Sequence, residues 1–329
     1  MLRFGCSQVV VERLDPLVNP DQNPSAHMHQ IVGGNAFSAS MPTTDISKLA
    51  TCTTCHFEQD FSNYWTANLY YRSLVNGTYK RVPQVANQFN DGDNAGITIY
   101  YTSPGPNLTT AFKPGFRMLA GDANRRTSEN LGNKMQQCYR CYTQPNFGGS
   151  PYAPCMDPVL DTDYLPKRSC PGGIRSNIVF PLCWDGKNLD TPNHQDHVAH
   201  PVGGPTSFAS VGGKCPASHP IKIPQVMYEV NWDTAHFIND PWPTDGTQPF
   251  VLSTGDTTGY GQHGDYVFGW EGNKLQEAMD NRCYLRNCSL LTAIAPAVKN
   301  KCSVPVTVTA DADLDAWLTE LPGGGHAEY

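Results

Sequence analysis

The sequence lacks any long apolar segment. Its best apolar runs, Leu290–Val298 and Val304–Val308, are much shorter than the roughly 20 residues that a membrane-spanning helix needs. We therefore expect no membrane span. Charged residues are also scarce, at 16% of the chain, and the net charge is −7. Because phosphate binding requires clustered Lys and Arg, this acidic balance argues against a nucleic-acid partner.

Several catalytic motifs are missing as well. The chain has no Gly-x-Ser-x-Gly elbow, which excludes the usual α/β-hydrolase nucleophile. It has no Gly-rich loop followed by Lys, which argues against a nucleotide site. The first residues, Met1–Phe4, do not resemble a signal peptide. We expect that a signal was cleaved or was replaced by a Met added for expression.

The chain is rich in cysteine and carries glycosylation sequons. There are 12 cysteines, and sequons begin at Asn76, Asn107 and Asn287. Cystines persist in oxidising compartments, and sequons are glycosylated in the secretory pathway. We therefore predict a secreted, extracellular glycoprotein with disulfide bonds.

Two Cys-x-x-Cys pairs leave the role of some cysteines open. The pairs at 52/55 and 138/141 have the spacing of zinc ligands. The long segment between the two pairs is unlike that of zinc fingers, so we favour cystines. The connectivity cannot be deduced from spacing.

Composition and pattern favour a β fold. The chain has 29 glycines and 27 prolines, and short apolar or β-branched runs recur between turn residues. We predict strands at Val9–Val11, His29–Val32, Ala67–Ser73, Ile97–Tyr101, Phe116–Leu119, Ile178–Leu182, Val226–Trp232, Phe250–Ser253 and Tyr266–Trp270. Helical patterns are fewer, at Asn124–Gln137, Lys274–Cys283 and Asp313–Leu321.

These patterns predict a mostly β protein, with one jelly-roll-type β-sandwich domain over residues 1–322 and a few short helices. A loop-rich insertion at about residues 124–176 is expected to be held by disulfides. Residues 323–329, which follow Pro322 and begin with three glycines, are expected to form a flexible tail.

Two short histidine motifs are the clearest functional signal. His27 and His29 lie on one face of an extended strand, as do His263 and Asp265, because strand side chains repeat every second residue. We predict that these four residues form one site for a divalent metal such as zinc, copper or manganese. The alternative is that they are partly buried hydrogen-bonding groups at strand ends.

Other residues are candidates for acid–base catalysis in the same cleft. His194, His197 and His200 recur every third residue in a segment bounded by prolines. We expect His194 and His197 to complete the cleft.

Carboxylates offer a second catalytic arrangement. Glu229 and Asp233 share one face of a predicted strand, about 13 Å apart. That separation exceeds the roughly 5–10 Å that glycosidases use, so Glu229 needs another partner. The alternative is a solvated strand face.

In a lyase scheme, His29 or His197 would remove a proton beside a uronic carboxylate, and Arg72 or Arg117 would neutralise that carboxylate. Tyr260 or Tyr266 would act as the acid. Aromatic residues such as Trp184 and Trp242 could stack on sugars, although aromatic residues also fill protein cores.

Seven blocks of sequence resemble a known family. They lie at 27–34, 52–70, 115–122, 180–201, 215–220, 228–234 and 253–270, and include the segments HMHQIVGG and GYGQHGDYVFGW. In this order they resemble a secreted fungal family of unknown function that often precedes WSC carbohydrate-binding modules. The resemblance runs from about Arg3 to about Cys302. It implies a secreted fungal protein acting at cell-wall or plant polysaccharide, without implying a reaction. The resemblance leads us to expect Tyr at position 200, so we set His200 aside.

Together these features predict a secreted polysaccharide-active enzyme, a lyase or a hydrolase, with a His-rich cleft. The catalytic candidates are His27, His29, His194, His197, Glu229 and Arg72. The alternative is a non-enzymatic extracellular protein that binds glycans, belongs to the wall or self-assembles.

Overall fold

The structure is a computed structural model, and it describes residues 1–87, 92–104, 109–129, 137–205, 211–311, 313–324 and 327. In these residues the chain forms 19 strands and two α-helices, arranged mainly as antiparallel sheets. The predicted mostly β, sandwich-like architecture is confirmed. No helix in these ranges is long and apolar enough to cross a membrane.

The larger of the two main sheets has seven strands. Their order is β1-β8-β16-β12-β10-β11. Strand β7 pairs with the last residues of β16, which extend past the end of β8. The strands are β1 (Leu2–Cys6), β7 (Gln84–Val85), β8 (Ile97–Thr102), β10 (Gln137–Cys141), β11 (Asp161–Thr162), β12 (Ile174–Val179) and β16 (Gln225–Trp232).

The second main sheet has five strands in the order β2-β3-β4-β18-β9. The strands are β2 (Gln8–Glu12), β3 (His29–Gly33), β4 (Asn63–Ala67), β9 (Arg117–Gly121) and β18 (His263–Val267). A four-stranded sheet comprises β5 (Leu69–Arg72), β6 (Tyr79–Arg81), β17 (Phe250–Leu252) and β19 (Trp317–Leu318). A three-stranded sheet comprises β13 (Cys183–Trp184), β14 (Val198–Ala199) and β15 (Ile221–Lys222).

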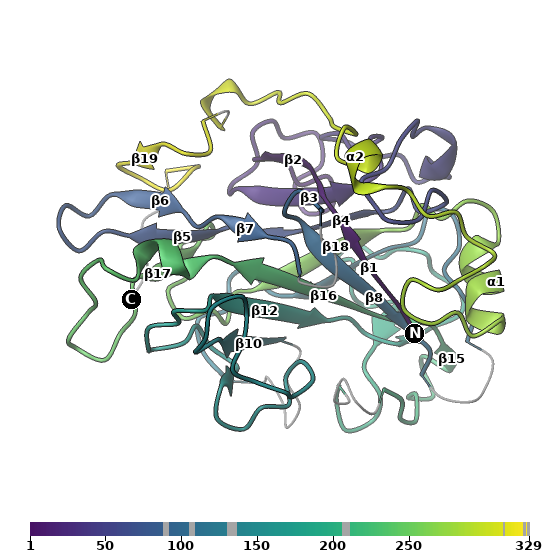
Figure 1. Cartoon of the computed structure of the whole chain (residues 1–329). Helices are drawn as coiled ribbons and strands as arrows, with labels where there is room; N and C mark the ends of the chain where they lie inside the picture. Colours follow the sequence, from purple (N-terminus) through teal and green to yellow (C-terminus); the bar gives the residue numbers. More distant parts are fainter. Residues whose placement is uncertain are drawn as a thin grey trace.

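The two main sheets enclose the largest core. In Figure 1, β2 and β3 lie in the upper part of the molecule and β12 and β10 in the lower part. Alternate residues of each strand face the partner sheet, as with Tyr228 and Val230 on β16. The Tyr228 hydroxyl donates to the Asp265 carbonyl on β18 at 2.5 Å and so connects the sheets.

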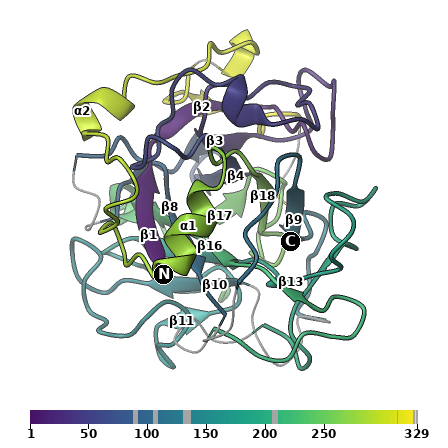
Figure 2. The same ribbon diagram turned by 90° about the vertical axis from the view of Figure 1, so that its right-hand side faces the viewer.

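Both α-helices are peripheral. Helix α1 (Lys274–Asp280) lies across one end of the sandwich (Figure 2) and inserts Leu275, Ala278 and Met279 into the core. It matches the predicted helix from Lys274. Helix α2 (Pro296–Lys299) begins with proline, whose fixed φ suits a first helical turn.

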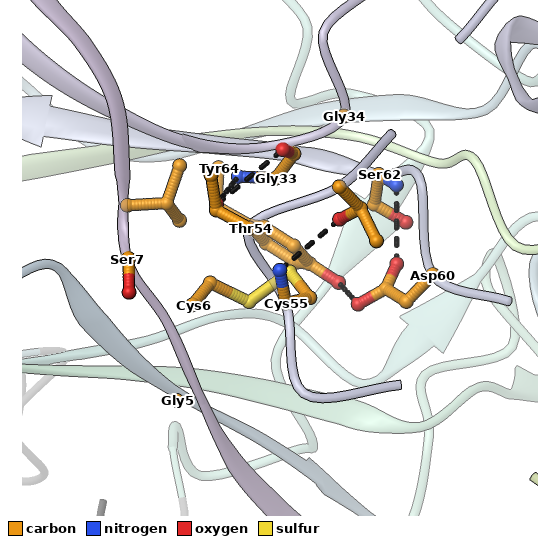
Figure 3. The surroundings of a disulfide bond; sticks show 12 residues. Gly5, Cys6, Ser7, Gly33, Gly34, Thr54, Cys55, Asp60, Ser62 and Tyr64 are labelled. Atoms are coloured by element: carbon orange, nitrogen blue, oxygen red, sulfur yellow. Dashed lines mark hydrogen bonds between the residues drawn. A yellow bond between two sulfur atoms is a disulfide. The ribbon is translucent and has the colours of Figure 1, made fainter. Parts of the chain in front are cut away.

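A polar cluster lies inside the core beside the Cys6–Cys55 disulfide. The Tyr64 hydroxyl donates to Asp60 Oδ2 at 2.6 Å, and the Ser62 amide donates to Asp60 Oδ1 at 3.1 Å (Figure 3). Asp60 is completely buried, and burial raises the pKa of its carboxyl to about 7. A buried carboxyl near neutrality makes stability depend on pH.

The cysteines form cystines, as predicted. The pairs are Cys6–Cys55, Cys52–Cys302, Cys138–Cys155, Cys141–Cys170, Cys183–Cys215 and Cys283–Cys288. Both Cys-x-x-Cys pairs are therefore divided between different disulfides. Six disulfides are consistent with an extracellular protein.

Several predicted elements differ from the structure. The helix predicted at Asp313–Leu321 is wrong, because Trp317–Leu318 forms β19 on the edge of a sheet and pairs with β6. Hydrogen bonding to the neighbouring strand β6 outweighs a weak helical pattern. The strand predicted at Ile178–Leu182 instead spans Ile174–Val179.

The segment predicted as a loop-rich insertion also contributes to the main fold. Strands β10 and β11 and the first part of β12 lie in it, and all three belong to the seven-stranded sheet. Disulfides Cys138–Cys155 and Cys141–Cys170 hold the loops between them. The helix predicted at Asn124–Gln137 falls largely on residues 130–136, which lie outside the described residues, and Gln137 begins β10.

The sequons at Asn76 and Asn287 are exposed, which is compatible with the predicted glycosylation. Asn107 lies outside the described residues, as does most of the predicted tail.

Candidate metal centre

Three of the four predicted metal ligands meet in the structure. His29 begins β3 and His263 begins β18, and these strands pair with opposite edges of β4. His27 lies two residues before His29. His263 Nε2 is 3.3 Å from His27 Nε2 and 3.4 Å from His29 Nε2. Segments more than 230 residues apart thus bring three imidazoles together.

Backbone contacts define the protonation of two of these rings. His29 Nδ1 lies 3.0 Å from the Leu14 carbonyl, and His263 Nδ1 lies 3.1 Å from the Gly261 carbonyl. A carbonyl oxygen only accepts hydrogen bonds, so each Nδ1 must carry the proton. In the neutral rings both Nε2 atoms then present lone pairs to each other across 3.4 Å. Two facing acceptors require a cation or a proton between them.

The spacing of these nitrogens fits a tetrahedral metal. With zinc–nitrogen bonds of 2.0–2.1 Å, two ligands of a tetrahedral zinc ion lie about 3.3 Å apart. The observed separations of 3.3 Å and 3.4 Å agree with that geometry. The carbonyls that hold the Nδ1 protons are typical outer partners of metal-binding histidines. These three residues can therefore hold a divalent metal ion.

Burial keeps the three rings neutral. It lowers the pKa of His27, His29 and His263, and the proximity of His29 and His263 lowers that of His27 further. Neutral imidazole is the form that binds metals. The triad thus remains able to bind a cation at mildly acidic pH.

Among the described residues, two buried carboxyl groups of interest, those of Asp265 and Asp15, lie outside the cluster of ligand nitrogens. Asp265, the fourth predicted ligand, follows His263 by two residues on β18 and is completely buried. Within the described part of the chain neither of its carboxylate oxygens has a hydrogen-bond partner, and burial raises its pKa well above the usual range. Asp15 is 2% exposed and accepts hydrogen bonds from the amides of Leu17 and Val18.

The triad opens onto a cavity of about 580 Å³. His27 and His263 line it together with Asp15. The same cavity is also lined by Asp122, Arg125, Gln195, Asp196 and His200. A ligand of the size of a few sugar rings can therefore approach His27 and His263.

His194 and His197 lie beside this cavity but have other partners. His197 donates from Nε2 to the Arg117 carbonyl at 2.8 Å and contacts the Thr191 hydroxyl through Nδ1 at 3.1 Å. His194 Nδ1 lies 2.6 Å from Asp190 Oδ1. These contacts attach the 190–197 segment to β9. They leave the His197 ring no free nitrogen for a metal.

The remaining predicted catalytic residues lie elsewhere. Glu229 lines a cavity on the seven-stranded sheet, and Arg72 lines a third cavity with Trp242. Tyr266, a candidate acid, is completely buried between the sheets. The structure therefore does not gather the six predicted catalytic residues into one cluster.

Sequence reasoning missed Asp15 and set aside His200, although both line the triad cavity. Nδ1 of His200 has no partner among the described residues, and burial lowers the pKa of this ring to about 4. The repeat of histidine at 194, 197 and 200 did contain a signal for His200. Asp15 follows a strand-like run, and nothing in its neighbours indicates a site.

The fold and site define a disulfide-rich β-sandwich protein with a three-histidine centre that opens to an acidic cavity. A family model described as "Domain of unknown function (DUF1996)" matches residues 15–270. The chain therefore belongs to this family, as its sequence blocks predict. No curated protein and no solved structure matches the chain significantly.

Proposed function

We propose that this protein is an extracellular hydrolase in which His27, His29 and His263 hold one divalent metal ion, with zinc the best fit. The observation that carries this proposal is the convergence of the Nε2 atoms, two of them fixed as acceptors by Nδ1 contacts to backbone carbonyls. Manganese prefers oxygen ligands in an octahedron and fits less well.

His27, His29 and His263 would hold the zinc ion, and a bound zinc ion would supply Lewis-acid activation for hydrolysis. Asp15 lines the same cavity as His27 and His263 and is the carboxylate that we propose as the proton acceptor there.

The proposed substrate is a polysaccharide. An acidic cavity with Asp15, Asp122 and Asp196 disfavours a uronic carboxylate, so hydrolysis is favoured over the lyase scheme. The polar lining and the open shape suit a neutral glycan chain, including one that carries ester or amide substituents.

The test combines metal content with product analysis. Protein purified without a His-tag is analysed for zinc, copper and manganese and then incubated with a panel of neutral, acetylated and acidic polysaccharides. We expect about one zinc per chain. We also expect new reducing ends or released acetate, and no absorbance from unsaturated products.

The key variant is His27→Ala, because His27 lies at the cavity wall and its loss should spare the core. His236→Ala is the matched control, because this exposed histidine is paired with Asp233 outside the cavity. Full metal content and unchanged product formation in His27→Ala would contradict the proposal. Retention of glycan without any product, whatever the metal content, would instead indicate a binding protein.

A further inference from the structure

A second polar surface lies on the outer face of the seven-stranded sheet. Val226, Tyr228 and Val230 of β16 face the core, so Glu229 and Asn231 point to the other side. The register pairs Asn231 with Arg175, and Arg175 with Arg140. Three polar side chains of neighbouring strands therefore form one row across the sheet.

This polar row is buried, which is unusual for the outer face of a sheet. Glu229, Asn231, Arg175 and Arg140 are between 1% and 6% exposed. Arg140 is satisfied by the Asp161 carboxylate and by two backbone carbonyls. Buried polar groups are almost always hydrogen-bonded, so any that are not require an explanation.

Two polar atoms in the row lack hydrogen-bond partners. In the ranges that the structure describes, Arg175 Nη2 and Asn231 Oδ1 are buried without a hydrogen bond. They belong to residues directly opposite each other on β12 and β16. A donor and an acceptor are thus both available in the same place, and leaving each unsatisfied costs roughly 1–3 kcal/mol.

Glu229 adds a fixed acceptor beside them. Its Oε2 accepts from the Tyr100 hydroxyl at 2.8 Å, and its Oε1 accepts from the Asn87 amide. The Glu229 carboxylate also interacts with the Arg175 guanidinium. Within the row the Glu229 carboxylate offsets the charge of Arg175, and the Asp161 carboxylate offsets that of Arg140, so a ligand that reaches the row needs no net charge. Arg3 also lines the cavity.

Aromatic side chains cover the row and leave a cavity of about 370 Å³. Tyr142, Phe147 and Tyr152 line it, and the Tyr142 and Phe147 rings meet edge to face with centroids 5.4 Å apart. The Cys138–Cys155 disulfide ties this loop to β10. Tyr152 is 51% exposed at the rim, where a ligand can reach its ring.

We propose that this cavity is a second ligand site and that it binds a neutral saccharide. Vicinal hydroxyls of a sugar ring both donate and accept, which satisfies Asn231 Oδ1 and Arg175 Nη2 together. The apolar face of the ring can pack on the exposed Tyr152. This site is independent of the metal centre, because it shares no lining residue with the triad cavity.

The test measures saccharide binding by metal-free protein. Calorimetry or ligand-observed NMR is performed with cellotriose, xylotriose, laminaritriose, mannotriose and chitotriose, and with galacturonotriose as the acidic counterpart. We expect at least one neutral trisaccharide to bind with a millimolar or lower Kd. Asn231→Leu and the rim variant Tyr152→Ala should each weaken binding about tenfold, which corresponds to about 1.4 kcal/mol.

The controls separate this site from the metal centre. Trp317→Ala removes another half-exposed aromatic side chain, outside this cavity, and should leave Kd within about twofold. His27→Ala should also bind normally. The proposal is overturned if no neutral trisaccharide binds at 10 mM, which is about ten times the expected Kd, or if only galacturonotriose binds. It is also overturned if His27→Ala abolishes binding while Asn231→Leu and Tyr152→Ala do not weaken it.

Discussion

The buried Asp60 carboxyl predicts a specific dependence of stability on pH. Asp60 lies in the core, where Tyr64 and Ser62 donate to it and burial raises its pKa to about 7. In the unfolded chain the pKa of an aspartate is about 3.9. Between these values the folded state binds more protons than the unfolded state, so stability must fall as pH rises.

The size of this effect follows from the two pKa values. The contribution of Asp60 to the free energy of unfolding should be highest below about pH 4 and should decrease until about pH 7. Because one pKa unit corresponds to about 1.4 kcal/mol, the full contribution is about 4 kcal/mol. About 3 kcal/mol of it falls between pH 4.5 and pH 7.5.

Asp60→Asn isolates this contribution, because asparagine keeps the shape of the side chain but does not titrate. Urea unfolding with intact disulfides, at pH 4.5 and at pH 7.5, gives the free energy of unfolding of each protein. The wild type should lose about 3 kcal/mol more than the variant between the two pH values. Equal losses in the two proteins would refute the assignment of a buried, protonated carboxyl to Asp60.

Two further predictions concern the metal and the disulfides. Zinc at about 100 times its Kd should stabilise the protein by about 2.7 kcal/mol. For a chain of 329 residues this raises the Tm by about 4 °C in a thermal scan, and a similar rise in His27→Ala would contradict the proposed ligands. Replacing both Cys52 and Cys302 with serine removes a link that spans 250 residues. The free energy of unfolding, measured by urea unfolding, should fall by about 5 kcal/mol according to the chain-entropy relation. A decrease below about 1 kcal/mol would mean that the rest of the fold already confines both segments.

The triad could be predicted from the sequence because strand geometry is local. His27 and His29, and likewise His263 and Asp265, are two residues apart, and alternation predicts that each pair shares one face of a strand. In the structure His27 lies just before β3. Their convergence depends on β3 and β18 both pairing with β4, which is a matter of topology. The sequence indicates the strands but not their order in a sheet.

The second site shows the same limit more clearly. Arg175, Asn231 and Arg140 become neighbours only through the register of three strands, of which β10 was not predicted. Glu229 was identified as a candidate, but its partners Tyr100 and Asn87 lie more than 120 residues away. Long-range hydrogen bonds of this kind leave no periodic signal along the chain.

His197 illustrates a different limit. Its spacing from His194 suggested a shared catalytic role. In the structure one of its ring nitrogens donates to the Arg117 carbonyl of β9, and the other contacts the Thr191 hydroxyl. A histidine with two structural partners and a histidine with a free Nε2 look the same in a sequence. Only the contacts of the second nitrogen distinguish them.

The most direct test of the central claim is X-ray absorption spectroscopy at the zinc edge, on protein loaded with one equivalent of zinc. We expect three imidazole nitrogens at about 2.0–2.1 Å and one further light ligand, with this signature lost in both His27→Ala and His263→Ala. If only oxygen atoms bind the zinc ion, or if the imidazole signature is unchanged in these two variants, the three histidines are not the metal ligands.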